Sequence, residues 1–426
     1  MIAALPALIV PASYAVAQNP PVLTTLYNFT GQNVDGANPE SAMVLGTGDV
    51  LYGVTFAGGT SNLGAVFQLT PLGGGGWSET VLHSFKGPLT DGSGPLGSLI
   101  ITNSGTLYGT TEYGGTITSA CSAGCGTVFA LSPPTVTGGA WTENVVYRFT
   151  GLNGDGSAPY GGVVLGQGGV LYGTTSGSGS GGKGTVFALT PPAHPGGAWT
   201  ETVLHKFMGL GDQDGAIPTS ALIIGAGGVL FGTTNYGGTT GYGTAFAMTP
   251  PAVAGKVWTE SILHSFPGAT GDGSVPFGSL TLGKNSVLYG TTNVGGSAEK
   301  GTVYQLTPPA IPGGAWSETV LYSFTGQNGD GSGPIAGAVI GKGGALYGTT
   351  YGGGISSKGG TVYEVAAPAA GIGPWTETVL YGFLGPLNGY GSGPIAGLVV
   401  GSAGALYGIT QYGGTGSDGT AFELTF

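Results

Sequence analysis

Charged residues are scarce in this sequence. Asp, Glu, Lys and Arg make up only 7% of its 426 residues, and nine Lys and Arg against 20 Asp and Glu give a formal net charge of −11. Binding to a nucleic-acid backbone needs clustered cations, so the composition excludes nucleic acid as a partner. Long apolar runs are also missing after the N-terminal segment. None reaches the ~18 residues of a membrane-spanning helix, so we expect no membrane span in the mature chain.

The N-terminal segment is apolar and ends in Ala15-Val16-Ala17. Small residues in this arrangement are typical of a signal-peptidase site, so we predict a signal peptide over residues 1–17 and a mature domain over 18–426. The basic residue that usually opens such a segment is absent, and the alternative is a buried N-terminal strand. We expect export to the cell surface or the medium, with the periplasm as the alternative location.

Cysteine occurs only at Cys121 and Cys125. Their spacing allows a small loop-closing disulfide outside the cytoplasm, whereas a metal site would need further Cys or His residues nearby, and the sequence has none there. We favour the disulfide.

Glycine, by contrast, is abundant, with 92 residues clustered in short groups between apolar runs. A collagen-like chain would need glycine at every third position, so these are turn glycines. With 40% hydrophobic residues the chain has enough material for a core. A Leu-aromatic-Gly triplet recurs at intervals of 56 to 64 residues, which indicates a tandem array. The triplets begin at Leu51, Leu107, Leu171, Leu230, Leu288, Leu346 and Leu406.

Each copy contains four short apolar segments separated by Gly, Pro, Asp or Ser clusters, which predicts four strands. In the sixth copy we expect strands over residues 336–340, 345–350, 361–366 and 375–383. The last of these is the longest.

The two ends of the chain are out of phase with the copies. Residues 23–29 align with the fourth strand of a copy, whereas the chain stops at residue 426 after a third strand. In a propeller the N-terminal strand can complete the last blade, which leaves no open sheet edge. We therefore predict an all-β, seven-bladed β-propeller of four antiparallel strands per blade, closed by the N-terminal strand. The alternative is a linear solenoid.

The repeated phrase is L-Y-G-T-T, then a double glycine, then G-T-V-F or G-T-V-Y. One copy reads Leu107-Tyr108-Gly109-Thr110-Thr111, with Gly114-Gly115 and Gly126-Thr127-Val128-Phe129. This phrase resembles the GloVer tandem repeat of bacterial exported proteins that carry varied C-terminal anchors. The resemblance covers nearly all of residues 23–426. It implies a secreted or surface setting and brings no assigned activity.

Six aspartates each open a D-G-x-x-P turn. We interpret each Asp as an acceptor for backbone N–H groups of its own turn, followed by a glycine free to take positive φ. The alternative is a calcium loop, but each turn usually offers one carboxylate. Asp212 with Asp214 is the best calcium candidate; otherwise we expect no metal and no cofactor. The six are Asp35, Asp91, Asp155, Asp214, Asp272 and Asp330, and Tyr390 replaces Asp in the seventh copy.

Six glutamates each lie two residues after a Trp in the fourth strand, where we expect them to protect an exposed sheet edge. The tryptophans are interpreted as packing anchors. The glutamates are Glu79, Glu143, Glu201, Glu260, Glu318 and Glu377. His83, His205 and His264 replace a Tyr of other copies and would lie far apart. No unique acid pair, triad or zinc site stands out, so we lean towards a non-enzymatic protein.

The loops after L-Y-G-T-T share one face of a propeller with the D-G-x-x-P turns, and they vary most between copies. Binding specificity is expected there. The candidate ligand-binding residues are Tyr113, Tyr236, Tyr242 and Tyr412, which could stack on sugar rings or cover glycine-rich turns. We predict a monomeric module that binds a glycan or a surface protein. The alternatives are an extracellular polysaccharide-active enzyme and a structural envelope component.

Overall fold

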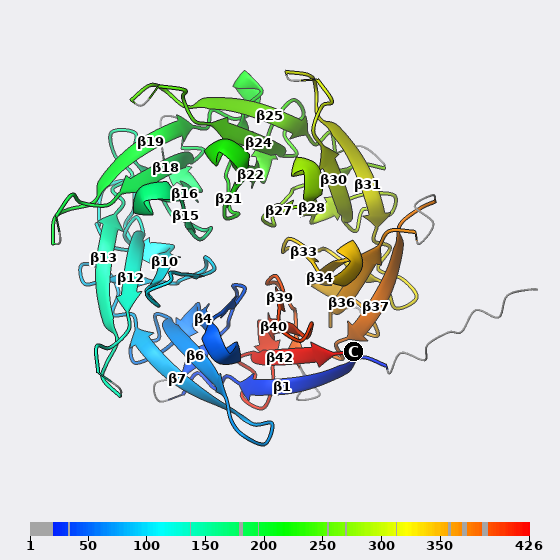
Figure 1. The fold of residues 1–426 in the computed structure, drawn as a ribbon, viewed down its shortest axis with the longest axis horizontal. Coiled ribbons are helices and arrows are strands. Elements are labelled where there is room, and N and C mark those ends of the chain that lie inside the picture. Colours follow the sequence, from blue (N-terminus) through cyan, green and yellow to red (C-terminus); the bar gives the residue numbers. More distant parts are fainter. Residues whose placement is uncertain are drawn as a thin grey trace, which may run out of the picture.

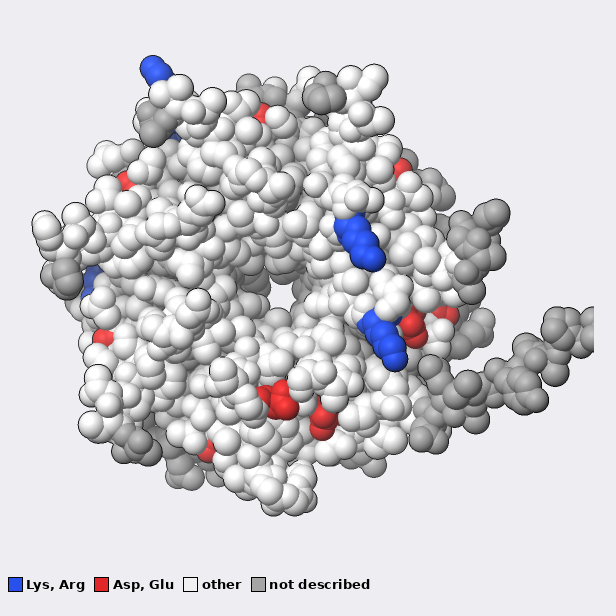
Figure 2. Space-filling view, in the orientation of Figure 1, with Lys and Arg blue, Asp and Glu red and all other residues white. Residues whose placement is uncertain are grey.

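The computed structural model describes residues 20–32, 35–136, 138–178, 182–194, 196–253, 255–268, 271–311, 313–356, 359–368, 373–385 and 391–426. The predicted signal peptide, residues 1–17, lies outside them. Within these ranges, seven four-stranded antiparallel sheets are arranged around a central axis (Figure 1). The prediction of an all-β, seven-bladed propeller is confirmed. The space-filling view shows an opening at the centre of the disc and few charged side chains on the face in view (Figure 2).

The innermost strand of each blade is only two residues long. In blades 1 to 7 these strands are β3 (Val44–Leu45), β9 (Ile100–Ile101), β15 (Val164–Leu165), β21 (Ile223–Ile224), β27 (Thr281–Leu282), β33 (Val339–Ile340) and β39 (Val399–Val400). The second strand holds the Leu-aromatic-Gly triplet. The second strands are β4 (Leu51–Thr55), β10 (Leu107–Thr111), β16 (Leu171–Thr175), β22 (Leu230–Thr234), β28 (Leu288–Thr292), β34 (Leu346–Thr350) and β40 (Leu406–Thr410).

The two outer strands are longer. The third strands are β6 (Ala65–Pro71), β12 (Thr127–Ser132), β18 (Thr185–Thr190), β24 (Thr244–Thr249), β30 (Thr302–Thr307), β36 (Thr361–Ala366) and β42 (Thr420–Thr425). The fourth strands of blades 1 to 6 are β7 (Trp77–Ser84), β13 (Thr142–Arg148), β19 (Thr200–Lys206), β25 (Thr259–Ser265), β31 (Ser317–Ser323) and β37 (Thr376–Gly382). The fourth strand of blade 7 is β1 (Val22–Asn28).

Each repeat also forms a short two-stranded ribbon, which the sequence did not predict. In most repeats the ribbon pairs the glycine of D-G with the first glycine of the double glycine that follows the second strand; in the third repeat Gly156 pairs with Ser178 instead. They are β2 (Gly36–Ala37) with β5 (Ala57–Gly58), β8 (Gly92–Ser93) with β11 (Tyr113–Gly114), β14 (Gly156–Ser157) with β17 (Gly177–Ser178), β20 (Gly215–Ala216) with β23 (Tyr236–Gly237), β26 (Gly273–Ser274) with β29 (Val294–Gly295), β32 (Gly331–Ser332) with β35 (Gly352–Gly353), and β38 (Gly391–Ser392) with β41 (Tyr412–Gly413).

The remaining elements are single 3₁₀ turns: η1 (Thr47–Asp49), η2 (Gln167–Gly169), η3 (Leu210–Asp212), η4 (Ala226–Gly228), η5 (Lys284–Ser286) and η6 (Lys342–Gly344). Five of the six join the first strand of a blade to its second. In the part of the chain that the structure describes, no helix has the length and apolar character needed to cross a bilayer.

The ring is closed by hydrogen bonding between the two ends of the chain. Strand β1 pairs antiparallel with β42, from Val22 opposite Thr425 to Asn28 opposite Thr420. Blade 7 is therefore built from both ends of the chain (Figure 1). This excludes the linear solenoid and confirms the phase shift read from the sequence.

Aromatic side chains fill the space between neighbouring blades. At each of the seven junctions, a Phe that follows the fourth strand of one blade packs edge-on against an aromatic ring in the third strand of the next. Ring centroids are 5.0 Å apart for Phe29 and Phe67 and 5.4 Å apart for Phe383 and Phe422. Such pairs add to the burial of apolar surface. The hydrophobic core is therefore a ring of seven clusters, each shared by two blades.

Each Trp packs against the second-strand aromatic of the preceding blade, as Trp77 does on Tyr407 and Trp141 on Tyr52. The interpretation of the tryptophans as packing anchors is confirmed. In the junction that contains the chain ends, Phe426 takes this place against Tyr347.

Candidate functional site

One cavity lies on the propeller axis and receives residues from all seven blades. Its volume is about 520 Å³. Each blade contributes the residue that directly follows the proline of its turn, and this position changes from copy to copy although the turn around it is repeated. The seven residues are Glu40, Leu96, Tyr160, Thr219, Phe277, Ile335 and Ile395. We call them the mouth ring.

The turn that carries each mouth-ring residue is fixed by the preceding blade. The residue before the proline has a left-handed backbone, as in Gly94 (φ 60°) and Val275 (φ 56°). Its N–H donates to a carbonyl of the preceding blade, for example Gly94 N to Leu63 O at 2.9 Å. The proline ring covers the glycine of the preceding G-T-V-F phrase, so that a Cβ on Gly64 would meet Pro95 at 2.5 Å. This explains why glycine recurs there.

The aspartate of the turn accepts backbone N–H groups, as the sequence predicted. Asp91 Oδ1 accepts from Lys86 N at 2.8 Å and from Gly92 N at 2.9 Å. The prediction for the following glycine was wrong, because Gly92 has no positive φ. A Cβ on Gly92 would instead collide with the Thr111 side chain. Close packing in the ribbon, rather than backbone handedness, therefore requires glycine at this position.

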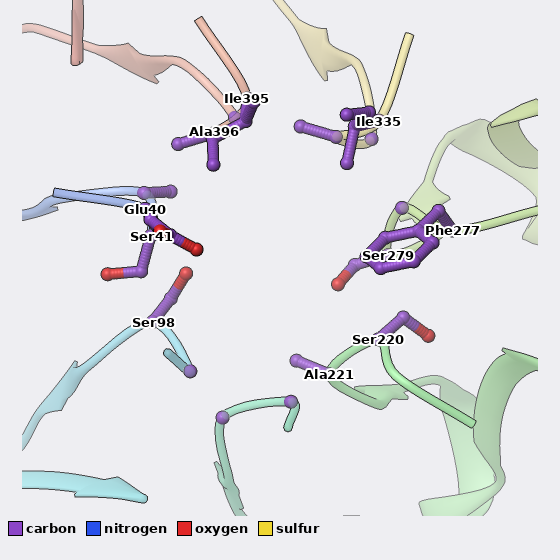
Figure 3. Close-up of a pocket in the computed structure, with 18 of the residues that line it drawn as sticks. Glu40, Ser41, Ser98, Ser220, Ala221, Phe277, Ser279, Ile335, Ile395 and Ala396 are labelled. Carbon is purple, nitrogen blue, oxygen red and sulfur yellow. The ribbon is translucent and has the colours of Figure 1, made fainter. Parts of the chain in front are cut away.

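The mouth of the cavity combines aromatic rings with a hydrogen-bonded carboxylate. Tyr160 and Phe277 meet edge to face, with centroids 5.9 Å apart. Glu40 Oε1 accepts from Gln411 Nε2 at 2.7 Å. Figure 3 shows Glu40 and Phe277 on opposite sides of the central space, with Ile335 and Ile395 between them on one flank. Gln411 and Tyr351 both directly follow a second strand, so the two predicted loop sets do share this face.

Burial raises the pKa values of the acidic residues around the mouth of the cavity. It raises the pKa of Glu40, an effect that the Gln411 hydrogen bond opposes and the Glu112 carboxylate reinforces. Burial likewise raises the pKa of Glu112, which accepts a hydrogen bond from Tyr113. Burial and these two carboxylates raise the pKa of Tyr160 to about 12, so its hydroxyl remains a hydrogen-bond donor at neutral pH.

Serine hydroxyls lie beside the mouth ring. Ser41, Ser98, Ser220 and Ser279 all line the cavity (Figure 3). Ser41 is 5% exposed, and its Oγ is buried with no hydrogen-bond partner among the described residues. Buried hydroxyls normally have a partner, so this oxygen is an exception among the residues around the cavity.

The four tyrosines singled out from the sequence lie on the same face but not in the cavity. Tyr113, Tyr236 and Tyr412 begin the short strands β11, β23 and β41 of three different blades, and Tyr242 precedes β24. All are exposed, from 37% for Tyr113 to 49% for Tyr236. The structure does not bring them together, and their role in binding stays a prediction.

The aromatic residues that do meet at the axis, Tyr160 and Phe277, were missed from the sequence. The signal that could have found them is the position after each turn proline, which holds a charged, polar, aromatic or aliphatic residue in different copies although the proline itself is present in all seven.

Cys121 and Cys125 are joined by a disulfide, with the sulfur atoms 2.09 Å apart. Of the proposed calcium pair, Asp214 Oδ2 accepts from Met208 N at 2.8 Å and lies 3.1 Å from His205 Nε2. Asp212 ends η3, and its side chain lies outside the described part of the structure.

The glutamate series does not protect a sheet edge, and that interpretation was wrong. Each Glu turns into the junction with the preceding blade, where one carboxylate oxygen is buried without a hydrogen-bond partner among the described residues. There it meets the turn Asp and a His or Tyr. In three junctions these groups form His–Asp–Glu clusters whose ligand atoms lie within 4.8 Å of one another: His83 with Asp91 and Glu143, His205 with Asp214 and Glu260, and His264 with Asp272 and Glu318.

These clusters escaped the sequence because the His and Asp come from one repeat and the Glu from the next. Only the ring brings them together. They could hold a metal ion, since His nitrogen and carboxylate oxygen are both common ligands.

The repeat itself can be assigned. A family model described as the Gloeobacter/Verrucomicrobia repeat matches residues 13–154, 115–310 and 252–426. The chain belongs to this repeat family. The resemblance to the GloVer repeat is confirmed. No curated protein sequence matches the chain.

Several solved structures resemble this member of the repeat family. An aldose sugar dehydrogenase from Streptomyces coelicolor in its PQQ-bound form is 14% identical, with a TM-score of 0.42 over 81% of this chain and 99% of that one. A gluconolactonase from Xanthomonas campestris is 13% identical (TM-score 0.38, covering 75% and 82%). A Trypanosoma rangeli sialidase is 9% identical (TM-score 0.43), and the match spans 96% of this chain and 59% of the sialidase. Sequence identities and TM-scores this low give no information about the activity of this protein.

Proposed function

We propose that this protein is an exported, non-enzymatic binding module that holds an uncharged saccharide, the end of a glycan, at the mouth ring. The observation that carries the proposal is the mouth ring itself: one repeat position, filled by six different residue types in seven copies, converges on a cavity whose frame is constant. Variation on a rigid frame is the usual basis of binding specificity. Export rests on the predicted signal peptide.

The chemistry of the cavity suits a sugar. The volume of about 520 Å³ falls in the range of small-molecule sites. Tyr160 and Phe277 offer aromatic surface to the C–H face of a ring, while Glu40 and Gln411 offer hydrogen bonds to its hydroxyls. Glu40 and Glu112 disfavour an anionic ligand by charge repulsion. A neutral saccharide satisfies all of these conditions.

The test is a glycan array with the mature chain, residues 18–426, followed by calorimetric titration of the best neutral ligand. We expect Phe277→Ala and Glu40→Gln each to weaken binding about tenfold or more, because each removes a cavity contact worth ~1–2 kcal/mol. Tyr236→Ala is the matched control, since it removes an exposed aromatic residue outside the cavity.

If no neutral glycan binds, or if binding is unchanged in both cavity variants, the proposal fails. Loss of binding only in Tyr236→Ala would move the site to the outer loops. Capture of a surface protein without any glycan would favour the protein-binding alternative instead.

A second function, hydrolysis of an extracellular polysaccharide, is favoured by one observation. Glu40 and Glu112 come from different blades, both have raised pKa values, and the charge of Glu112 contributes to the shift of Glu40. Two carboxyls with perturbed pKa values are what a glycosidase uses as acid and base. Release of reducing ends from a polysaccharide panel, abolished in Glu112→Gln, would support this function over simple binding.

A further inference from the structure

The seven blade junctions repeat one polar cluster with a variable member. The fourth strand of one blade supplies a Tyr or a His. In six of the seven junctions the following turn supplies an Asp and the fourth strand of the next blade supplies a Glu; the junction between blades 6 and 7 has Tyr390 and Leu23 at these positions. Three junctions carry His, namely those between blades 1 and 2, 3 and 4, and 4 and 5. The junction between blades 4 and 5 differs from the other two in how its ligand atoms are satisfied.

In most junctions the Asp accepts a backbone N–H from the residue after the fourth-strand Phe. The donor is Lys86 N to Asp91 at 2.8 Å and Met208 N to Asp214 at 2.8 Å. The Tyr junctions use a Thr in the same way, as Thr325 N does to Asp330 at 2.6 Å. In these junctions a backbone N–H therefore stabilises the Asp carboxylate.

Pro267 occupies the donor position between blades 4 and 5, and proline has no N–H. Asp272 Oδ1 accepts from Gly273 N at 2.5 Å. Its other oxygen, Oδ2, lies 3.3 Å from His264 Nε2. His264 Nε2 and Glu318 Oε1 are both buried and have no hydrogen-bond partner among the described residues. Three potential ligand atoms thus face one another within 4.8 Å without the backbone donor that the other junctions supply.

We propose that this junction binds a divalent transition-metal ion such as Zn²⁺ through His264 Nε2, Asp272 Oδ2 and Glu318 Oε1. One imidazole nitrogen and two carboxylate oxygens are a common ligand set for this class of ion, and water completes the coordination. An ion there pairs with two partly buried carboxylates that otherwise repel each other. Because its ligands come from two blades, the ion also clamps blade 4 to blade 5.

The other two His junctions bind such an ion more weakly. His83 Nε2 is 3.0 Å from Asp91 Oδ2, and His205 Nε2 is 3.1 Å from Asp214 Oδ2. In both junctions this contact is a hydrogen bond, and Asp214 Oδ2 also accepts from Met208 N, so a metal would have to replace existing hydrogen bonds. The junctions with Tyr lack the nitrogen ligand altogether.

The test uses the mature chain after dialysis against a chelator, titrated with Zn²⁺ and, for a visible spectrum, with Co²⁺. We expect one tight equivalent of Zn²⁺ per chain. His264→Tyr introduces the residue that four other junctions carry, so it preserves the fold while lowering affinity ~100-fold. Pro267→Thr removes no ligand but restores the N–H donor to Asp272, and we expect it to lower affinity ~10-fold.

His194→Gln is the control, because His194 is an exposed histidine outside the junctions. It should leave the affinity for Zn²⁺ and the Co²⁺ spectrum unchanged. Absence of binding below millimolar Zn²⁺, or an affinity that is the same in His264→Tyr, would overturn the proposal. The readout does not involve the mouth ring, so it stands or falls separately from glycan binding.

Discussion

Glutamates buried between blades should make this protein more stable in mild acid than at alkaline pH. Of the four junctions with Tyr, we take the three that contain a glutamate, namely Glu79, Glu201 and Glu377, and replace each Glu by Gln. Burial and the neighbouring Asp330 carboxylate raise the pKa of Glu377 to about 7. Burial and Asp35 do the same for Glu79, and burial and Asp155 for Glu201, where Lys206 opposes the rise.

The direction follows from the raised pKa. The folded protein holds these protons more tightly than the unfolded chain, in which a Glu titrates near 4.5. The stabilisation is therefore complete below about pH 4.5 and is lost as the pH rises through 7. Gln is neutral at every pH and imitates the protonated acid, so the variant should lose this dependence.

The pKa shift sets an upper limit on the change in the free energy of unfolding. A rise from 4.5 to about 7 is worth at most ~3 kcal/mol per group. These side chains are only partly buried, so screening by solvent reduces the effect to about 1 kcal/mol each. The three junctions are far apart and should add to about 3 kcal/mol. For a chain of this length that corresponds to a difference in Tm of about 4 °C.

The assay is thermal unfolding by calorimetry from pH 4.5 to 8.5. We expect the triple variant and the wild type to melt together near pH 4.5, and the variant to melt about 4 °C higher at pH 8.5. Glu299→Gln, which removes an exposed carboxylate, is the control. Parallel curves for the triple variant and the wild type across this range would refute the coupling of Glu and Asp between blades.

The chain contains internal support for this coupling. Leu23 pairs with Leu424 in blade 7 as Glu79 pairs with Leu69 in blade 1, so Leu23 stands where the other blades have Glu. The Asp of the same junction is replaced by Tyr390, which lies outside the described residues. The junction that lacks one carboxyl thus lacks the other as well.

Two further predictions concern the frame. Ile217 and Val275 are β-branched residues at the left-handed position before the turn proline, where three other copies have Gly. Replacing each by Gly should raise the free energy of unfolding by about 1 kcal/mol, measured by denaturant titration, because relief of strain exceeds the added entropy of the unfolded chain; a destabilised variant would contradict this. Removing residues 18–29 deletes β1 and exposes the edge of β42, with loss of Leu26 and Phe29 from the core. We expect a loss of roughly 5 kcal/mol or more and self-association on size-exclusion chromatography; an unchanged monomer would refute closure by β1.

Much of the fold was readable from the sequence because it is set by local patterns. In the sixth copy the expected strand over residues 361–366 is the observed β36. The expected 345–350 starts one residue before β34, and the expected 375–383 is one residue longer than β37 at each end. The expected first strand, 336–340, was too long, since β33 spans only Val339–Ile340. Near the axis the blades crowd together. At Gly337, for example, an added Cβ would collide with the Ser279 carbonyl of the neighbouring blade.

Features that depend on two repeats at once were not readable. The Glu of each junction is about 50 residues from its Asp partner in the sequence, and only the angle between blades brings them into contact. The same holds for Tyr160 and Phe277, which come from blades 3 and 5 and whose rings meet in the axial cavity.

The amino-acid sequence alone determined the number of blades, the four strands in each and the completion of the last blade by the first strand, because alternation, turn glycines and repeat phase are short-range signals. Tertiary structure alone decided which residues share the axial cavity and which His, Asp and Glu meet between blades. Those contacts depend on the closed ring, whose radius and blade angle arise from the packing of all seven cores together.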